Sequence, residues 1–449
     1  MRTTKKRNVS RRFFLKAAAR MGLLTAAGGP FFVFPERAQA SQKKLRILQW
    51  KHFIPSYDKW FSEVFARDWG HKYDAKVIVD HAPREKIRQR AAAEVAARKG
   101  HDLVMFLSPP AAYESDVIDH GEIYRDLRHN WGETIELVHR STYNPHTKKY
   151  FAFSDSYIPA PFNWLKDIWS EAGLPLGPID YATLLRVGAK IRQARGIPCG
   201  FGMAEEMDSN IALHSILSSF GGRIQDEHGR VALRSRNTVE ALKFMKALFQ
   251  ETETAGAFGW KSNSNDKALL AAKISCTINA ISISREAEHK NREASSRIML
   301  SPALKGPADS LSPPHVTQCY VIWNFAENKE GAKQFLIDLI GRFTEAFRAS
   351  QFCNFPSFPK TVPDLLNHLN GDPRASPQGK YAVLRDTLLW TKNVGYPGYS
   401  SAGIDEVATA FVVPRMFAKA ARGELSPEEA AQEADRETKL IFARWGQAG

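Results

Sequence analysis

The chain has 449 residues, of which 43% are apolar and 24% charged, a composition typical of globular proteins that excludes a disordered or collagen-like chain. Its net charge of +14 suggests nucleic-acid binding, but residues 1–40 hold nine Lys or Arg and one acidic residue, a net charge of +8. The other residues carry a surplus of only +6, spread along the chain, which favours a solvated basic surface and leaves a weak preference for an anionic partner.

The first forty residues have the three parts of an export signal. A basic start precedes a mostly apolar stretch over residues 17–34, and Ala38-Gln39-Ala40 supplies a small-x-small cleavage site. The segment SRRFFLK over residues 10–16 resembles the twin-arginine export motif. We therefore predict a twin-arginine signal peptide over residues 1–40 and a mature protein in the periplasm. An uncut membrane anchor is the alternative, and no later stretch of 18 or more apolar residues predicts a membrane span.

Four cysteines lie far apart, without a Cys-x-x-Cys pair or the spacing of a zinc site. They are too few and too scattered for a disulfide scaffold. Most are expected to be buried free thiols, with one or two disulfide bridges as the open alternative. The four positions are Cys199, Cys276, Cys319 and Cys353.

Strands and helices alternate at the start of the mature chain. Apolar, strand-like runs cover residues 45–50, 75–80 and 102–107, and helical patterns cover residues 57–70 and 83–99 between them. Strands and helices that alternate through short loops in this way predict an open parallel α/β sheet.

The stretch over residues 150–173 marks a crossing from this first body to a second one. It begins as extended chain, and Pro159 and Pro161 then prevent a long strand, because proline has no amide donor. Residues 163–172 have a helical pattern, with Trp164 on its apolar stripe. We therefore expect the chain to leave one packed body as a strand and to begin the next with a helix.

The rest of the chain continues the alternation. Residues 274–278 are interpreted as the return crossing, and the strand-like run 316–325 is expected to cross once more. A closing helix over residues 426–445 begins at Ser426 as N-cap, with Glu429 at the third position. Further expected elements are helices at 181–195, 211–220, 238–249, 330–350 and 406–417, a hairpin at 222–231, a strand at 299–303 and an irregular segment at 355–378.

These elements predict an α/β fold of two lobes, each an open mixed sheet with helices on both faces, and a cleft between the lobes. The expected division assigns residues 41–157 and 280–322 to lobe 1. It assigns residues 158–279 and 323–449 to lobe 2.

Residues just after the first three strands and at the crossings are the candidates for a site, because ligands bind outside the carboxyl ends of strands in open α/β sheets. Aromatic rings with a polar rim suit sugars, since sugar C–H groups stack on the ring while polar atoms bind hydroxyls. The candidate ligand-binding residues are Trp50, His52, Asp80, His81, Ser108, Tyr157, Trp164, Asn279 and Tyr399.

Several of these candidates also have a purely structural interpretation. Trp50 at a strand end is equally well explained as a core residue, and His52 and His81 as ordinary polar loop residues. Asp80 could cap the helix that follows it, and Asn279 could bind a backbone partner instead of facing the cleft.

Motifs of catalysis are missing from the sequence. No G-x-G-x-x-G follows a strand, and neither a phosphate-binding G-x-x-x-x-G-K-[ST] loop nor an H-E-x-x-H pair occurs. Residues 398–403 match a nucleophile elbow only loosely, since the glycine spacing is one residue too long. We therefore assign no catalytic residue, no metal ligand and no cofactor, and expect a protein that is not an enzyme.

Four segments carry a resemblance to a known family. They are WLKDIWSEAGLP over residues 164–175, LSSFGGRI over residues 217–224, DKALLAAKISCTIN over residues 266–279 and GELSPEEA over residues 423–430. In their order and spacing the chain resembles the extracellular solute-binding proteins of ABC transporters, of the maltose-type group of sugar binders. One departure is Phe162-Asn163-Trp164, where the family usually has a tyrosine and asparagine pair before the helix.

The resemblance implies a type II periplasmic-binding-protein fold that closes on its solute by hinge motion and passes it to a membrane permease. The expected function is that of a monomeric receptor for a carbohydrate, polyol or glycoside. Two alternatives stay open: an exported cofactor-dependent enzyme, and a binding protein for a charged solute such as a polyamine or a phosphate ester.

Overall fold

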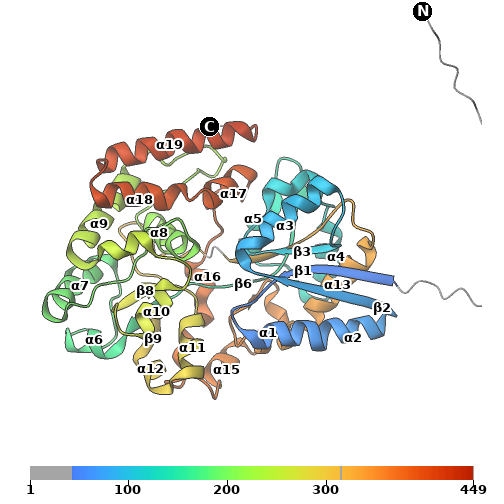
Figure 1. Cartoon of the computed structure of the whole chain (residues 1–449), viewed down its shortest axis with the longest axis horizontal. Helices are drawn as coiled ribbons and strands as arrows, with labels where there is room; N and C mark the ends of the chain where they lie inside the picture. Colours follow the sequence, from blue (N-terminus) through green and yellow to red (C-terminus); the bar gives the residue numbers. More distant parts are fainter. Residues whose placement is uncertain (1–42, 314–315, 448–449) are drawn as a thin grey trace, which may run out of the picture. The chain divides into compact units, whose positions relative to one another are not determined.

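The computed structural model describes residues 43–313 and 316–447 (Figure 1). The predicted signal peptide over residues 1–40 lies outside the described residues. In the described part of the chain, buried apolar side chains form two large hydrophobic cores, one for each of two lobes. No helix among the described residues has the length and apolar character needed to cross a membrane.

The first core is built on a six-stranded mixed sheet with the order β11-β6-β10-β3-β1-β2. β1 pairs in parallel with β2 and β3, which confirms the parallel sheet predicted for the start of the chain. β10 pairs antiparallel with both β3 and β6. The strands are β1 (Lys43–Trp50), β2 (Ala75–Ala82), β3 (Leu103–Phe106), β6 (Phe153–Tyr157), β10 (Thr317–Ile322) and β11 (Phe355–Pro356).

Helices cover this sheet because their apolar residues recur every three or four positions. Tyr57, Phe61, Phe65 and Trp69 are buried along one continuous helical stretch, as the sequence predicted. The helical elements of this lobe are α1 (Pro55–Lys59), the π-helix η1 (Trp60–Ala66), α2 (Arg67–Lys72), α3 (Arg84–Ala97), η2 (Ala111–Asp116), α4 (Gly121–Trp131), α5 (Glu136–Thr142), α13 (Lys329–Gly341), α14 (Phe343–Ala349), η4 (Pro359–Thr361), α15 (Leu365–Asn370), η5 (Lys380–Asp386) and α16 (Thr387–Trp390). A short hairpin joins β4 (Tyr143–Asn144) to β5 (Lys149–Tyr150).

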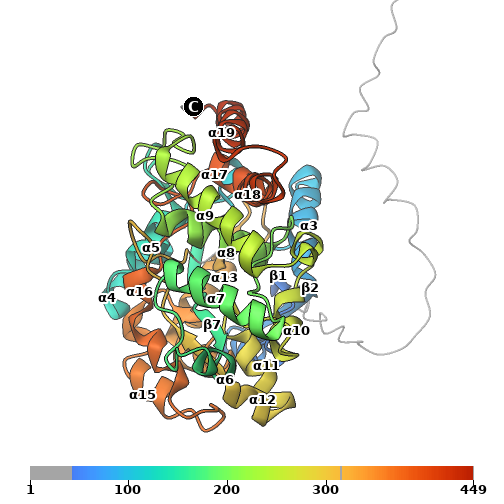
Figure 2. The same ribbon diagram turned by 90° about the vertical axis from the view of Figure 1, so that its left-hand side faces the viewer.

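The second core is built on a three-stranded antiparallel sheet of β7 (Phe162–Leu165), β8 (Cys276–Ile278) and β9 (Ile298–Ser301), in the order β8-β7-β9. Figure 2 shows α7, α8 and α9 lying side by side over this lobe. Its helical elements are α6 (Lys166–Glu171), α7 (Tyr181–Arg195), α8 (Met207–Ser219), α9 (Arg236–Thr252), η3 (Ala255–Gly259), α10 (Ser264–Leu270), α11 (Ser282–Lys290), α12 (Arg292–Arg297), α17 (Ala402–Thr409), α18 (Val412–Arg422) and α19 (Pro427–Arg444).

Three predicted helices begin late or are interrupted in the structure. The helix expected over residues 406–417 is interrupted at Phe411, whose φ of 54° separates α17 from α18. The helix expected over residues 163–172 is wrong at its start, because β7 is paired on both sides and holds its residues in a sheet until Leu165. The single helix expected over residues 330–350 is broken at Arg342, whose φ of −110° and ψ of 20° separate α13 from α14. The N-cap predicted at Ser426 is confirmed, with Glu429 completing a capping box.

The packing of two segments differs from the expected division into lobes. Apolar residues from Ala326 to Trp390 pack in the first core, although the sequence assigned residues 323–449 to lobe 2. β9 pairs in the second sheet, although residues 280–322 were assigned to lobe 1. An apolar helix face shows that a segment is buried but does not identify the sheet that it covers, so these boundaries stay a prediction.

A small apolar cluster lies at the border of the two cores. Ile158 follows β6 and Val316 precedes β10, so both stand where the chain passes between the two sheets, whereas Ala280 lies between β8 and α11 of the second lobe. The backbone amide of Ile158 donates to the carbonyl of Val316 at 2.9 Å. We call these three residues the connecting cluster. The interpretation of residues 274–278 as the return crossing is wrong, because β8 leads into α11 and β9, which pack in the second lobe.

Candidate functional site

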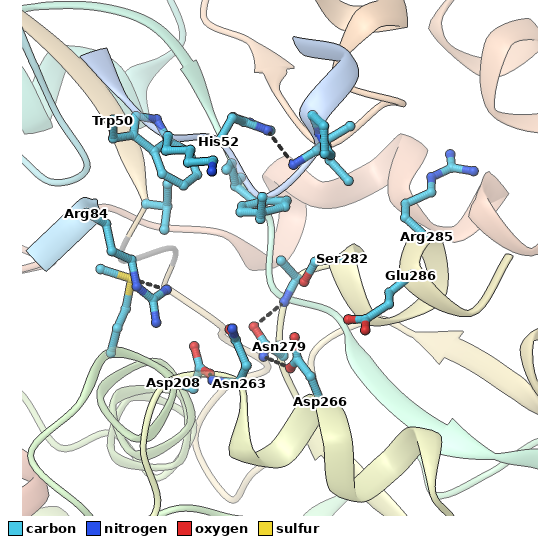
Figure 3. Close-up of a pocket in the computed structure, with 18 of the residues that line it drawn as sticks. Trp50, His52, Arg84, Asp208, Asn263, Asp266, Asn279, Ser282, Arg285 and Glu286 are labelled. Atoms are coloured by element: carbon cyan, nitrogen blue, oxygen red, sulfur yellow. Dashed lines mark hydrogen bonds between the residues drawn. The ribbon is translucent and has the colours of Figure 1, made fainter. Parts of the chain in front are cut away.

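A cavity of about 740 Å³ is lined by all three residues of the connecting cluster and by residues of both lobes (Figure 3). The first lobe contributes the loop after β1, with Trp50, His52 and Phe53, and the start of α3, with Arg84. The second lobe contributes the side chains of Asp208, Asn263, Asp266 and Asn279, and α11 adds Ser282, Arg285 and Glu286.

The first wall follows from the register of the parallel strands. Trp50 at the end of β1 lies opposite Ala82 at the end of β2, so the loops after both strands open at the same edge of the sheet. Pro83 is then the N-cap residue of α3, and Arg84 is its first residue. A strand end and a helix start are thereby brought to one side of the cavity.

The aromatic part of this wall is a tilted cluster of rings. The ring centroids of Trp50 and His52 are 4.7 Å apart, and those of His52 and Phe53 are 4.6 Å apart. Phe53 is 37% exposed, while Trp50 and His52 are buried. The exposed ring of Phe53 at the cavity offers an apolar surface on which a ligand can stack.

His52 is held as a neutral imidazole. Its Nδ1 accepts a hydrogen bond from the backbone amide of Ile54 at 2.9 Å, and its Nε2 donates to Oδ1 of Asn354 at 3.1 Å. Burial lowers the pKa of His52 to about 4. His52 therefore contributes shape and position to this wall, and no charge at neutral pH.

The opposite wall carries two buried carboxylates. Glu206 is the N-cap of α8 and accepts a hydrogen bond from the backbone amide of Asp208 at 2.8 Å, which places Asp208 in the first turn. Asn279 donates from Nδ2 to Oδ1 of Asp266 at 2.7 Å, and its own Oδ1 accepts from the backbone amide of Ala280 at 2.7 Å. The asparagine thus fixes the carboxylate of Asp266 beside Ala280 of the connecting cluster.

Neither carboxylate is neutralised within the described part of the chain: no lysine, arginine or histidine nitrogen there forms an ion pair with Asp208 or Asp266. Burial raises the pKa of Asp208. Burial, and then the charge of Asp208, raises the pKa of Asp266 to about 8. The pair therefore holds a proton at neutral pH.

Arg84 faces this pair from the first lobe. Figure 3 shows its guanidinium pointing toward Asp208 and Asn263. Nε of Arg84 lies 3.0 Å from Oε1 of Glu85, and Nη1 lies 3.9 Å from the sulfur of Met207. Nη2 is buried and has no hydrogen-bond partner. The guanidinium therefore has donor capacity left for a guest in the cavity.

Three of the nine candidate residues line the cavity: Trp50, His52 and Asn279. The other six lie elsewhere in the structure. Asp80 accepts a hydrogen bond from Nε2 of His101 at 2.9 Å, and His81 shares one with Oγ of Ser62 at 2.8 Å. Both residues lie within β2, which continues to Ala82, and their side chains contact neighbours at the surface of the first lobe instead of the cavity.

The remaining four are occupied by contacts within the fold. Ser108 accepts a hydrogen bond from Arg88 at 2.9 Å, and the Tyr157 hydroxyl is shared with Thr387 at 2.8 Å. Trp164 is buried in the second core and donates to Oγ of Ser301 at 2.9 Å, because β7 is a strand and not the predicted helix. The ring of Tyr399 lies 5.0 Å from the guanidinium of Arg140.

Sequence reasoning missed Arg84, Asp208 and Asp266. All three stand in the first turn of a helix. Acidic residues at that position are usually explained by the helix dipole. The signal that could have identified Arg84 is its place directly after the Pro83 that ends the second strand.

No protein-family model matches the chain. A candidate binding protein of Brucella abortus is 23% identical over 169 residues, which are 37% of this chain and 41% of the relative. A candidate binding protein of Brucella suis matches to the same extent. The chain thus matches about two-fifths of the length of these curated relatives.

Solved structures match over nearly the whole described chain. A sugar transporter protein of Arthrobacter chlorophenolicus with bound laminaribiose has a TM-score of 0.73 at 15% identity, covering 89% of this chain and 99% of that one. Maltose-bound MalE3 of T. maritima has a TM-score of 0.72 at 18% identity, covering 89% and 99%. The sugar-binding protein MalE of Xanthomonas citri has a TM-score of 0.70 at 15% identity, covering 91% and 100%. The chain therefore has the two-lobed fold of the periplasmic-binding proteins, as the sequence predicted.

Proposed function

We propose that this chain is a periplasmic receptor that binds a carbohydrate, polyol or glycoside, closes on it by hinge motion and delivers it to the permease of an ABC importer. The carrying observation is the cavity at the connecting cluster, which both lobes line with polar side chains and an aromatic wall. Export by the twin-arginine pathway, a monomeric state and the absence of a cofactor are parts of the same proposal.

Hinge motion is supported by the thin connection between the cores. The buried residues of the connecting cluster, Ile158, Ala280 and Val316, have only Leu107 and Met207 packed against them as partly buried apolar side chains, so bending there disturbs little packing. The packing of residues 326–390 supports a division in which they belong to lobe 1 and the chain returns to lobe 2 near residue 391.

A thermal-shift titration tests the proposal. Mature protein is titrated with maltose, laminaribiose, other oligosaccharides, simple sugars and polyols, and a bound solute raises the melting temperature because it binds only the folded state. Arg84→Gln and Asn279→Ala are expected to reduce the shift, whereas exposed Arg128→Gln should leave it unchanged. A panel without any response would contradict a carbohydrate ligand.

An exported enzyme with a cofactor is the alternative of a different class. An absorption spectrum and metal analysis of protein purified from the periplasm decide between the two. A stoichiometric chromophore or metal would overturn the receptor proposal.

A second candidate function is binding of a solute that carries an amine. The observation that favours it is the pair Asp208 and Asp266, two buried carboxylates without an ion pair among the described side chains. Buried charges are normally paired, and an ammonium group would supply the missing partner. A protonated pair that only donates to sugar hydroxyls is the alternative.

Glucosamine and spermidine, set against glucose and glycerol, separate these two cases. An ammonium ligand displaces the proton held by the pair, so the affinity of spermidine, whose amines stay largely protonated in this range, should rise between pH 6 and pH 8, while the affinity of a neutral sugar should not. Affinity for the amine should also fall with added salt. Equal responses of glucose and glucosamine at both pH values would exclude the amine preference.

A further inference from the structure

Two helices from different lobes are joined by an ion pair. Arg88 lies on α3, which packs on the first core through Ile87 and Ala91, and Asp405 lies on α17, which packs in the second core through Ile404 and Val407. Nη2 of Arg88 is 2.6 Å from Oδ1 of Asp405, and Nη1 is 3.0 Å from Oδ2. This two-point geometry is the strongest arrangement of a guanidinium and a carboxylate.

The pair is enclosed by the first lobe. The Asp405 side chain is only 4% exposed, and Arg88 is 31% exposed. Nη2 of Arg88 also donates to Oγ of Ser108 at 2.9 Å, and the guanidinium lies 5.7 Å from the ring of Phe106. Burial raises the pKa of Asp405, and the charge of Arg88 opposes that rise. Arg88 of the first lobe therefore supplies the hydrogen bonds and the positive charge that stabilise this carboxylate of the second lobe.

The pair stands next to the cavity. Arg84, one helical turn before Arg88 on the same helix, lines the cavity and faces Asp208. Figure 1 shows α17 near α3 at the border of the two lobes, where Arg88 and Asp405 meet. Moving α3 away from the second lobe would open the cavity and separate Arg88 from Asp405 in one motion.

A second contact between the lobes has a different place. The backbone amide of Ser400 donates to the carbonyl of Arg140 at 2.8 Å, and Nη1 of Arg140 donates to the carbonyl of Pro397 at 2.7 Å. These contacts lie within ten residues of the connection between Trp390 in the first core and Val394 in the second. Arg140 is therefore a matched control: an arginine between the lobes, but close to a connecting segment.

We propose that Arg88 and Asp405 form a latch that holds the two lobes closed in the absence of solute and thereby raises the affinity of the cavity. This inference rests on the hinge motion of the proposed function. The apparent affinity for a solute is proportional to the fraction of protein that is already in the binding-competent form. Loss of the latch lowers that fraction, because opening then no longer separates a buried charge from its partner.

The latch is tested on the ligand-free mature protein by pulsed electron–electron distance measurement. Spin labels are attached to cysteines introduced at exposed Arg128 on α4 and Lys190 on α7; the four native cysteines are buried. Arg88→Gln and Asp405→Asn are each expected to lower the ratio of short to long distances about tenfold. The double variant should fall no further, since either change removes the same interaction.

The controls make each outcome decisive. The Arg140→Gln variant should retain the distance distribution of the unmodified chain, and the exchange Arg88→Asp with Asp405→Arg should restore part of the short distance. Urea unfolding shows that each variant is folded. An unchanged distribution in both single variants, or the same shift in Arg140→Gln, overturns the latch. A carbohydrate panel without response would reject the proposed ligand class but leave this distance result valid.

Discussion

Two sets of buried carboxylates in this protein have opposite surroundings. Beside α11, Glu288 lies 2.8 Å from Arg285 and 3.0 Å from Lys380, and Asp372 lies 2.6 Å from Arg285. At the cavity, Asp208 and Asp266 have no ion pair among the described side chains. Burial alone would raise the pKa of Asp372, but the charge of Arg285 and the hydrogen bonds and charge of Arg374 together lower it, while the pKa of Asp266 is raised to about 8.

This difference distinguishes carboxylates that stabilise the fold from carboxylates that are available to bind a solute. The Arg285 cluster neutralises its own charges and ties α11 to the first lobe, since Nε of Arg285 also donates to the carbonyl of Gln351 at 2.9 Å. At the cavity, Asp208 and Asp266 form no ion pair among the described side chains, although Arg84 lines the same cavity with an unused donor. Buried polar groups without partners lower the stability of the folded protein. A bound solute that pairs with these groups at the cavity would remove that destabilisation.

The largest expected effect comes from removing the arginine of the Arg285 cluster. Arg285→Met leaves Glu288 and Asp372 buried with fewer cations, and should lower the free energy of unfolding by about 3–5 kcal/mol, measured by urea titration. Arg374→Gln, which removes a 41% exposed partner of the same Asp372, should cost about 1 kcal/mol or less. Similar losses from the two variants would contradict the distinction.

The next effect concerns the cavity and depends on pH. The pKa of Asp266 is about 8 in the folded protein, against an ordinary value of 3.8, so the folded state holds a proton that the unfolded chain releases between these values. Stability therefore falls as pH rises from about 4 to about 8, by up to about 1.4 kcal/mol per pH unit. Asp266→Asn should remove this slope and stabilise the protein above pH 8, as unfolding at pH 5, 7 and 9 would show.

The same variant also tests the site. Asn279 can still donate to the amide oxygen at position 266, so the local geometry is kept. A stabilised variant that binds its solute more weakly would place Asp266 in the binding surface. Unchanged solute binding would assign the raised pKa to packing alone.

A smaller effect of opposite sign is expected in acid. The pKa values of buried His52 and His120 are lowered to about 4, against an ordinary value of 6.5. Both stay neutral in the folded state while the unfolded chain takes up protons, so stability is lost as pH falls from about 6.5 toward 4. His52→Gln should lessen this loss by up to about 1.4 kcal/mol per pH unit, whereas the partly exposed His81→Gln serves as its matched control.

The smallest effect lies far from both carboxylate sets. Ser426→Ala removes the N-cap of α19, whose Oγ accepts from the backbone amide of Glu429 at 3.2 Å, and should cost about 1 kcal/mol. Ser426→Gly should cost only a few tenths. The losses in the free energy of unfolding of these two variants give the size of an ordinary helix-cap contribution. The losses of the charged variants can be compared with it.

The fold could be predicted well where sequence pattern and tertiary packing agree. The apolar runs at residues 45–50, 75–80 and 102–107 are strands of the parallel part of the first sheet. The failure at Trp164 has a physical cause: its spacing from Ile168 fits a helix, but β8 and β9 pair with it on both sides. Tertiary hydrogen bonding of this kind overrides a local pattern.

The site could be predicted only in part. Trp50 and Asn279 line the cavity because Trp50 ends β1 and Asn279 directly follows β8, and both strand ends lie at the cavity. Tyr157 stands equally close in sequence to a connection, but its strand turns the ring into the first core. Arg84 and Asp266 are 182 positions apart in the sequence, and only the packing of the two lobes brings both to one cavity.

The two ends of the described chain belong to different lobes, because β1 begins at Lys43 in the first sheet and α19 ends at Arg444 against the second core. Fluorescent proteins fused before Lys43 and beyond Arg444 would therefore be attached to different lobes. Closure would change the energy transfer between them, so the native chain order already has the layout of an optical sensor for its own solute.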